Sequence, residues 1–235
     1  GTGGSGVVII RTAIQTPAVF LFTLNIAFYI LQSILNTSSV INIGENDSYI
    51  CNYNTNGIVQ WSSSQGGTDN DNGNSITVDS NGNILLVGTY SSPVFYIQGS
   101  NQNQLILSSH SEINGFITKY SSNNIPLWAA SNILTLNSGA FILGSYTGVA
   151  TSSNDNIYIV GNYTIPTISF NPANGQINYS QPLNIVASGA LNGFLVKYSS
   201  NGDVLWAINQ GGSNNNYNTS ITIDKNENIY IGGYY

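Results

Sequence analysis

The chain has 235 residues, and its ten acidic and four basic residues give it a net charge of −6 at pH 7. So few cations argue against a surface for nucleic acid or for an anionic membrane, because such surfaces gather lysine and arginine. Hydrophobic residues make up 41% of the sequence and are regularly placed. That pattern argues against disorder. A chain of 235 residues is long enough to bury one sizeable core.

The first apolar stretch in chain order is Thr16–Leu35, TPAVFLFTLNIAFYILQSIL. A membrane-spanning helix needs about 20 apolar residues, and polar Thr23, Asn25 and Gln32 interrupt this run. The stretch also lacks the basic flank and small-residue cleavage site of a signal peptide. A membrane span and a signal peptide are the alternatives. The prediction is strand and packed connection within a soluble β fold.

A longer phrase occurs three times, beginning at Asp47, Asn114 and Asn192. The copies read DSYICNYNTNGIVQWS, NGFITKYSSNNIPLWA and NGFLVKYSSNGDVLWA. Each copy places a tryptophan at the same distance from its start, and these tryptophans are Trp61, Trp128 and Trp206. Self-similarity at this period predicts a repeat architecture, with the tryptophans on equivalent strands and filling the wedge between neighbouring units.

A second block follows the first and third copies. It reads SITVDSNGNILLVGTY from Ser75 and SITIDKNENIYIGGYY from Ser220, and the middle copy departs from it. Its short β-branched runs are joined by turn residues, as in antiparallel hairpins. No segment has the 3.6-residue period of a convincing helix. The predicted fold class is all-β, with four antiparallel strands per unit that repeat radially as propeller blades.

These residues resemble the bacterial-type β-propeller repeat known as the seven-bladed β-propeller (SBBP) repeat. The resemblance covers most of residues 47–235 and implies four-stranded antiparallel blades, forming an arc or fragment of a larger propeller. Many members of this family look like surface or secreted binding proteins, and similar repeats occur in proteins of large DNA viruses. The ranges that carry the resemblance are Ser75–Gly88, Asn114–Trp128, Asn192–Gly212 and Ser220–Gly233.

The repeat predicts how the whole chain is organised. Val7–Ile10 aligns with Ile84–Val87, which predicts the second strand of an incomplete blade. The long connections Thr89–Ile113 and Asn162–Leu191 are expected to form an extra hairpin or a packed loop. We predict one β-propeller repeat domain over 1–235, divided as follows: the end of one blade with a long connection at 1–74, a second blade at 75–131, a third at 132–212 and the start of a fourth at 213–235.

Groups able to do chemistry are sparse. Cys51 is the single cysteine, so no internal disulfide can form, and it is predicted to be a buried filler. His110 is the single histidine, in the polar loop SSHSE, and is predicted to be solvated. Lys119 and Lys197 share one repeat position and are predicted to be structural. We therefore assign no catalytic residue and predict that the chain is not an enzyme.

The acidic loops are the one candidate for a cofactor, which would be calcium. DNDNGN places Asp69 and Asp71 beside a glycine, as in the first half of a calcium loop, but the distant bidentate glutamate is missing. A solvated turn is the alternative. The repeated DSNGN at Asp79 and DKNEN at Asp224 are explained by Asx-turn geometry without a metal.

Two classes of function fit these features. The first is a non-catalytic structural or binding module, extracellular or displayed on a cell or virion surface, that contacts a protein or a glycan. The alternative is the propeller portion of a carbohydrate-active or lyase-type enzyme whose catalytic residues lie outside this segment. We expect no nucleic acid and no membrane span. Edge strands are expected to pair with more of the same chain or with a neighbouring copy, and pairing of the chain's own two ends is not expected.

Overall fold

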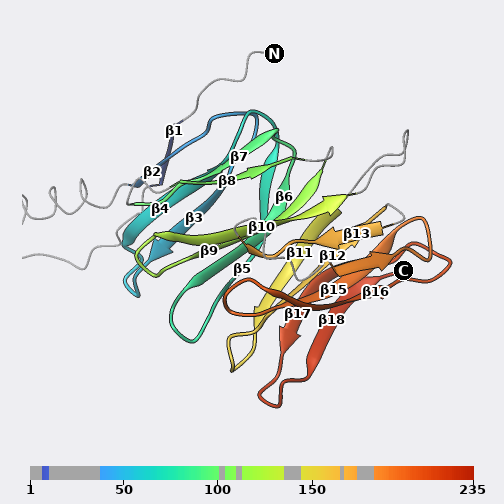
Figure 1. Cartoon of the computed structure of the whole chain (residues 1–235). Helices are drawn as coiled ribbons and strands as arrows, with labels where there is room; N and C mark the ends of the chain where they lie inside the picture. The colour runs from blue at the N-terminus through green and yellow to red at the C-terminus, as the bar shows by residue number, and fades with distance from the viewer. Residues whose placement is uncertain are drawn as a thin grey trace, which may run out of the picture.

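The computed structural model describes residues 7–10, 38–100, 104–109, 113–134, 144–164, 167–173 and 183–235. This part of the chain is built of antiparallel strands that form three larger sheets and two separate hairpins (Figure 1). The prediction of an all-β chain with four-stranded antiparallel units is confirmed. Thr16–Leu35 and His110 lie outside the described residues.

The first and third sheets have four strands each. The first has the order β3-β4-β7-β8, with bounds Ser48–Tyr53, Val59–Gly66, Val94–Ile97 and Leu105–Ser108. The third has the order β11-β12-β15-β16, with bounds Gly144–Thr151, Ile157–Tyr163, Asn192–Tyr198 and Val204–Gln210.

The second sheet has six strands, in the order β14-β13-β10-β9-β6-β5. Their bounds are Leu183–Val186, Thr167–Phe170, Pro126–Leu134, Asn114–Tyr120, Ile84–Tyr90 and Asp71–Val78. The two separate hairpins are β1–β2, at Val7–Ile10 and Ser38–Ile41, and β17–β18, at Tyr217–Ile223 and Ile229–Tyr234.

A short capped turn closes the hairpin between β5 and β6. Asp79 Oδ1 accepts hydrogen bonds from the backbone N–H groups of Asn81 (3.0 Å) and Asn83 (2.8 Å). Gly82 has a φ of +76°, in the left-handed region that glycine adopts without steric cost. Asp224 accepts the equivalent pair of hydrogen bonds in the β17–β18 turn. The predicted Asx-turn geometry is therefore confirmed at both aspartates.

The three tryptophans occupy equivalent places on β4, β10 and β16, as the repeat predicted. The register pairs Asn52 with Trp61, Lys119 with Trp128, and Lys197 with Trp206. Each tryptophan also packs in an apolar cluster with the next unit along the chain. Trp61 lies with Ile84 and Tyr120, Trp128 lies with Ile157 and Val196, and Trp206 lies with Ile223 and Ile229. The prediction that they fill the wedge between units is confirmed.

The long connections form hairpins, as expected, and each hairpin adds to the preceding sheet. β7 and β8 lie between the second and third strands of one unit, yet β7 pairs with β4, where Gln65 faces Ile97. β13 and β14 likewise extend the second sheet, because Asn132 of β10 faces Phe170 of β13. Each added hairpin therefore extends a sheet whose other strands come earlier in the chain.

The expectation for Val7–Ile10 is wrong. A second strand of a blade would lie beside β3, as β6 lies beside β9, but β1 pairs with β2 over four residues. In the part of the chain that the structure describes, β3 stands at the end of its sheet, paired with β4. The apolar run VVII is compatible with many buried strands. Its alignment with Ile84–Val87 therefore did not determine which strand it pairs with.

An aromatic side chain opposite a glycine recurs in the core of the second and third sheets. Gly88 of β6 faces Phe116 of β9, and Gly161 of β12 faces Phe194 of β15. A Cβ at Gly88 would lie 2.7 Å from Phe116 Cε1, and one at Gly161 would lie 2.5 Å from Phe194 Cζ. Both rings are fully buried, so the glycines leave the space that these rings fill.

Candidate functional site

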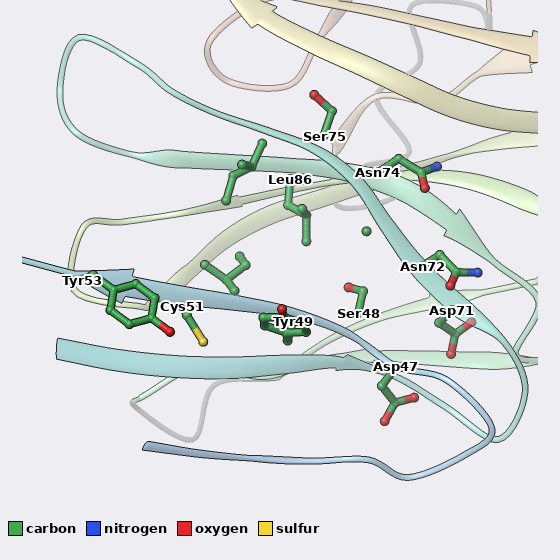
Figure 2. Close-up of a pocket in the computed structure, with 13 residues that line it drawn as sticks. Asp47, Ser48, Tyr49, Cys51, Tyr53, Asp71, Asn72, Asn74, Ser75 and Leu86 are labelled. Carbon is green, nitrogen blue, oxygen red and sulfur yellow. The ribbon is translucent and has the colours of Figure 1, made fainter. Parts of the chain in front are cut away.

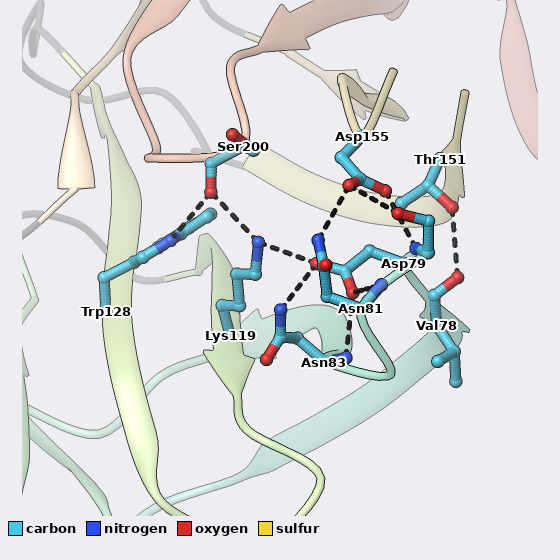
Figure 3. A network of polar contacts seen from close by, with 10 residues as sticks. Val78, Asp79, Asn81, Asn83, Lys119, Trp128, Thr151, Asp155 and Ser200 are labelled. Carbon is cyan, nitrogen blue, oxygen red and sulfur yellow. Dashed lines mark hydrogen bonds and ion pairs between the residues drawn. The ribbon is translucent and has the colours of Figure 1, made fainter. Parts of the chain in front are cut away.

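A buried cluster of polar contacts at Lys119 joins the second sheet to the third. Lys119 Nζ lies 2.9 Å from Asp79 Oδ2, and both side chains are nearly inaccessible, at 6% and 1% exposure. Lys119 Nζ also donates to the carbonyl oxygen of Ser200 (3.0 Å), and so does Trp128 Nε1 (3.3 Å), as Figure 3 shows. The predicted structural role of Lys119 is confirmed, because all these contacts hold strands and turns together.

Hydrogen bonds set the ionisation of Asp79. Burial alone would raise the pKa of Asp79, but hydrogen bonds from Asn83 and Lys119 outweigh burial and lower this pKa overall. Asp79 Oδ2 accepts from the Asn83 side-chain amide at 2.9 Å as well as from Lys119. The carboxylate is thus held charged at the centre of a turn, away from solvent.

Acidic side chains in two of the turns accept hydrogen bonds from the preceding unit. Asp155 accepts hydrogen bonds from the backbone N–H (2.8 Å) and hydroxyl (2.7 Å) of Ser80 and from the Asn81 amide (2.9 Å) (Figure 3). Glu227 accepts from the backbone N–H of Ser153 at 3.0 Å and from its hydroxyl. Both acids stand at the turn position with positive φ, at 58° for Asp155 and 66° for Glu227. The sequence pattern did not identify this contact between units.

Lys197, at the same repeat position as Lys119, has different surroundings. Ser152 stands where the second sheet has Asp79, as the matching turn hydrogen bonds show. Lys197 Nζ lies over the ring of Tyr158, 5.0 Å from its centroid, which is a cation–π contact. The predicted structural role holds for Lys197 too, with an aromatic ring in place of a carboxylate.

A groove lies between β3 and β5, with a volume of about 530 Å³, and is here called the β3 groove (Figure 2). Tyr49 and Tyr53 of β3 and Asn72 and Asn74 of β5 are among its lining residues. Cys51 also lines the groove and is half-buried, so the prediction that it is a buried filler is wrong. Burial raises the pKa of the Cys51 thiol.

Asp71 lies at one end of the β3 groove and is fully buried. Its carboxylate accepts hydrogen bonds from Gly67 N (2.8 Å), Ser91 N (3.1 Å) and the Ser92 hydroxyl (2.6 Å), although burial raises its pKa. Asp69 is exposed, in the same loop. Within the described ranges no three His, Cys, Asp or Glu residues are grouped as metal ligands. Calcium binding by Asp69 and Asp71 stays a prediction.

A second groove lies beside β18, with a volume of about 490 Å³, and is here called the β18 groove. Tyr217 and Tyr234 stack across β17 and β18, with ring centroids 4.5 Å apart and an angle of 17° between the rings. Asn209 and Gln210, at the end of β16, supply side-chain amides to the same groove. No short motif marks this surface in the sequence, and its one signal is the tyrosine-rich stretch NIYIGGYY.

Comparison with known proteins agrees with this architecture. Residues 60–89 match a protein-family model described as a beta-propeller repeat. The chain is also similar to an uncharacterized WD repeat-containing protein of Acanthamoeba polyphaga mimivirus, with 27% identity over 162 residues. The aligned part is 67% of this chain and 11% of that relative. Among the described residues, no helix is long and apolar enough to cross a membrane.

The match over residues 60–89 and the antiparallel sheets both support a β-propeller repeat protein. The predicted resemblance and the predicted propeller fold are confirmed. Both matches support a propeller module of the structural or binding kind.

Proposed function

We propose that this β-propeller repeat chain is a non-catalytic scaffold that binds protein partners by strand addition at its unpaired sheet edges. One observation carries the proposal: β3 and β18 have the sequences of central strands but, within the described residues, lie at the edges of their sheets. Their counterparts β9 and β12 are buried at every position, whereas β3 and β18 each contain both buried or half-buried residues and exposed ones. Strand addition uses the unpaired backbone groups of such an edge for affinity and its side-chain positions for specificity.

The composition of these edges supports the proposal. Natural proteins protect free edges with charged residues or proline, and neither SYICNY in β3 nor IYIGGY in β18 contains one. Tyr49 of β3 is 58% exposed and Tyr234 of β18 is 60% exposed. Exposed tyrosines are enriched where proteins bind one another.

The non-catalytic part of the proposal is supported by how the polar groups are used. Lys119, Asp79, Asp155 and Asp71 all hold turns or neighbouring units together by hydrogen bonds and an ion pair. An acid or base for catalysis needs access to substrate, and Lys119 and Asp79 are buried in contacts between strands.

A test of strand addition uses a charge placed on the edge of β3. Proteins captured by the immobilised chain are purified, and backbone amide exchange of the chain is measured with and without each of them. Binding by strand addition is expected to slow exchange of the β3 or β18 amides and to leave β12 unchanged. Tyr49→Lys should abolish protection of β3, whereas Val186→Lys, at an exposed position of β14, should not. Protection elsewhere with β3 and β18 unchanged would contradict the proposal.

A glycan is the second candidate ligand, and the stacked pair Tyr217 and Tyr234 favours it. Flat aromatic faces beside the amides of Asn209 and Gln210 offer both apolar and hydrogen-bonding contacts in the β18 groove. A panel of oligosaccharides titrated against the chain should then shift the NMR signals of these tyrosines. Tyr234→Ala should weaken that binding. If none of the sugars changes the NMR spectrum of the chain, a glycan is not its ligand.

Display on a virion or cell surface is also part of this proposal. Its support is the similarity to a protein of a giant virus, together with a surface of few charges. Antibodies raised against the chain should label intact particles or intact cells of its source without permeabilisation. Labelling that requires permeabilisation would reject surface display and leave strand addition untouched.

A further inference from the structure

We propose that Asn81 is a site of spontaneous deamidation, and that its hydrogen bond to Asp155 governs the reaction. While the second and third sheets stay joined at this turn, Asp155 holds the side-chain amide of Asn81 and the reaction is slow. When the contact opens, the freed amide reacts, and the carboxylate that forms keeps the contact from closing again. The change therefore marks irreversibly that the two sheets have parted, and it is independent of the proposed strand addition.

Deamidation needs only two neighbouring residues of the chain and water. Asparagine is a thermolabile residue. The backbone nitrogen of the next residue attacks the side-chain carbon Cγ and loses its proton. A C–N bond forms, the bond from Cγ to Nδ2 breaks, and ammonia carries the proton away. Water then opens the five-membered succinimide ring at either carbonyl group, which gives aspartate or isoaspartate. Glycine favours the attack because it has no side chain to obstruct its nitrogen.

Six Asn–Gly pairs lie in the described part of the chain, and their surroundings divide them. Asn114 and Asn192 are fully buried at the start of strands. Asn72 is held in the ladder between β5 and β6, opposite Thr89. The other three pairs occupy exposed turns between paired strands, and their asparagines are Asn56, Asn81 and Asn201. Among the described pairs, these three are therefore the candidates for fast reaction.

The three turns share one local geometry. Their glycines have φ values of +73° at Gly57, +76° at Gly82 and +90° at Gly202. Each of these glycine N–H groups donates to the carbonyl oxygen of the residue that opens the turn, at 3.0 Å. The attacking nitrogen is restrained to the same degree in all three, so the backbone does not produce a difference between them.

The side chain of Asn81 differs from the other two because the third sheet holds it. Its Nδ2 donates to Asp155 Oδ2 at 2.9 Å (Figure 3). Asn56 and Asn201 are exposed, and no hydrogen bond of either side chain is present among the described residues. The attack requires the side chain of Asn81 to rotate until Cγ faces the Gly82 nitrogen, and the bond to Asp155 opposes this rotation. The intact contact therefore slows the reaction at Asn81 and at neither of the other two.

The product weakens the contact that restrained the asparagine. Asp155 accepts two hydrogen bonds from Ser80, at 2.8 and 2.7 Å, besides the one from Asn81. Aspartate at position 81 replaces the amide donor with a second carboxylate, and like charges so close to each other repel. Isoaspartate carries the backbone through the former side chain and lengthens the turn by one carbon atom. Either product removes a donor and adds repulsion.

The two turns equivalent to this one have no glycine after the asparagine. Asn154 and Asn226 match Asn81 in position, and the residue after each of them is acidic. A side chain on the following residue obstructs the attacking nitrogen, so these two asparagines are expected to react slowly. Gly82 is the residue that makes the turn of the second sheet labile.

Incubation of the chain at mildly alkaline pH, followed by peptide mass mapping, tests the proposal. Each deamidation adds one mass unit, and Asn56 and Asn201 serve as internal references. In the unmodified chain Asn81 should react more slowly than both. Asp155→Gly removes the acceptor, and glycine fits the φ of 58° at this position. This variant should raise the rate at Asn81 about tenfold, because a hydrogen bond to a charged group contributes that factor or more.

Three outcomes of this incubation would overturn the proposal. The first is an Asn81 that reacts as fast as Asn56 and Asn201 in the unmodified chain. The second is an unchanged rate at Asn81 in Asp155→Gly. The third is an equal rise at all three sites in that variant, which would show a general loosening of the chain in place of control by Asp155.

Gly82→Asp tests the chemistry of the reaction. Asp155 has a φ of 58° at the equivalent turn position, so aspartate fits there. The variant should keep the contact between the sheets and lose deamidation at Asn81, while Asn56 and Asn201 react as before. Continued reaction at Asn81 would show direct hydrolysis of the amide and would reject the ring closure.

Asn81→Asp reproduces the product and tests its effect on the contact. The backbone N–H of Ser80 donates to Asp155 Oδ1, so exchange of this amide reports whether the contact is closed. Exchange at Ser80 should be about tenfold faster in Asn81→Asp than in the unmodified chain, since charge-assisted hydrogen bonds are lost. Asn201→Asp, the same change in a turn without such a partner, should leave it unchanged. Undiminished protection of Ser80 in Asn81→Asp would show that the contact closes over the carboxylate, and would reject the irreversible mark.

Discussion

The second and third sheets place a lysine at the same repeat position and treat it differently. Lys119 and Lys197 both face a tryptophan on the next strand, so their backbone places are the same. Lys119 is buried against Asp79 and Ser200, whereas Lys197 is half-buried over the ring of Tyr158. The residue that differs is in a turn far along the chain, where Asp79 is replaced by Ser152.

At this position the repeat determines the register of the lysine, and the turn determines its electrostatic surroundings. A buried charge is tolerated only when a partner neutralises it and hydrogen bonds satisfy it. The second sheet supplies such a partner for its lysine and the third sheet does not. The lysine of the third sheet accordingly keeps contact with solvent.

The largest expected effect comes from removing the buried lysine. Lys119→Met leaves Asp79 buried without its cation, and losing one partner of a buried pair costs about 3–5 kcal/mol. Lys197→Met removes a cation–π contact at a half-buried site, which costs about 0.5–1 kcal/mol. Urea unfolding followed by tryptophan fluorescence measures both free energies. Equal losses would show that the two lysines are equivalent after all.

The next effect is the removal of the charge of Asp79, and it depends on pH. Asp79→Asn should cost about 1.5–3 kcal/mol at neutral pH, because Lys119 loses its charged acceptor. The folded chain lowers the pKa of Asp79, so the stabilisation by its carboxylate is present above the ordinary pKa of about 3.9. It is lost as the pH falls through the lowered value.

The stability difference between the unmodified chain and Asp79→Asn should therefore shrink as the pH falls below 4. Urea midpoints measured across acid pH test this, with Ser152→Ala as a control that carries no carboxylate at the same turn position. A difference that grows towards acid pH would mean that the pKa of Asp79 is raised in the folded chain.

A smaller effect is expected from the indole hydrogen bond. Trp128→Phe removes the donor to Ser200 O and should cost about 1 kcal/mol beyond the change in packing. Trp206→Phe, at a half-buried place that contacts Tyr158 across an edge-to-face pair, should cost less. Thermal unfolding of the two variants makes the comparison, and a larger loss for Trp206→Phe would reverse this ranking.

The smallest effect comes from transferring the acid to the third sheet. Ser152→Asp places a carboxylate in the turn facing Lys197, and a half-exposed ion pair contributes about 0.2–1 kcal/mol. The gain should vanish in Ser152→Asp combined with Lys197→Met. A loss of stability in Ser152→Asp alone would indicate that the buried turn cannot accommodate the carboxylate.

The repeated phrase made the strands and their register predictable, because identical local patterns fold alike. Trp61, Trp128 and Trp206 fell on equivalent strands for this reason. The partner of each added hairpin was not predictable, since two residue pairs, Gln65 with Ile97 and Gly66 with Tyr96, join β4 to β7. So few long-range pairs leave little trace in a single sequence.

The candidate site was harder to predict than the fold. Both grooves arise where strands meet across different units, and no short motif marks such a place. Cys51 and Tyr49 look like ordinary members of a buried strand, because the equivalent residues in β9 and β15 are buried. Their exposure depends on a neighbouring strand, and local sequence carries no information about that neighbour.

The hairpins β7–β8 and β13–β14 affect the order in which the sheets form while the protein is being synthesised. The outer edge of β10 receives its partner only after β13 and β14 have left the ribosome. From the end of β10 at Leu134 to the end of β14 at Val186 the ribosome adds roughly 50 residues, which takes about 3–10 seconds at 5–20 residues per second. A hairpin forms in microseconds, so the pace of translation sets when each sheet is completed. We expect the sheets to be finished in order from the N-terminus, with each edge of a nascent sheet left open for seconds until its successor covers it.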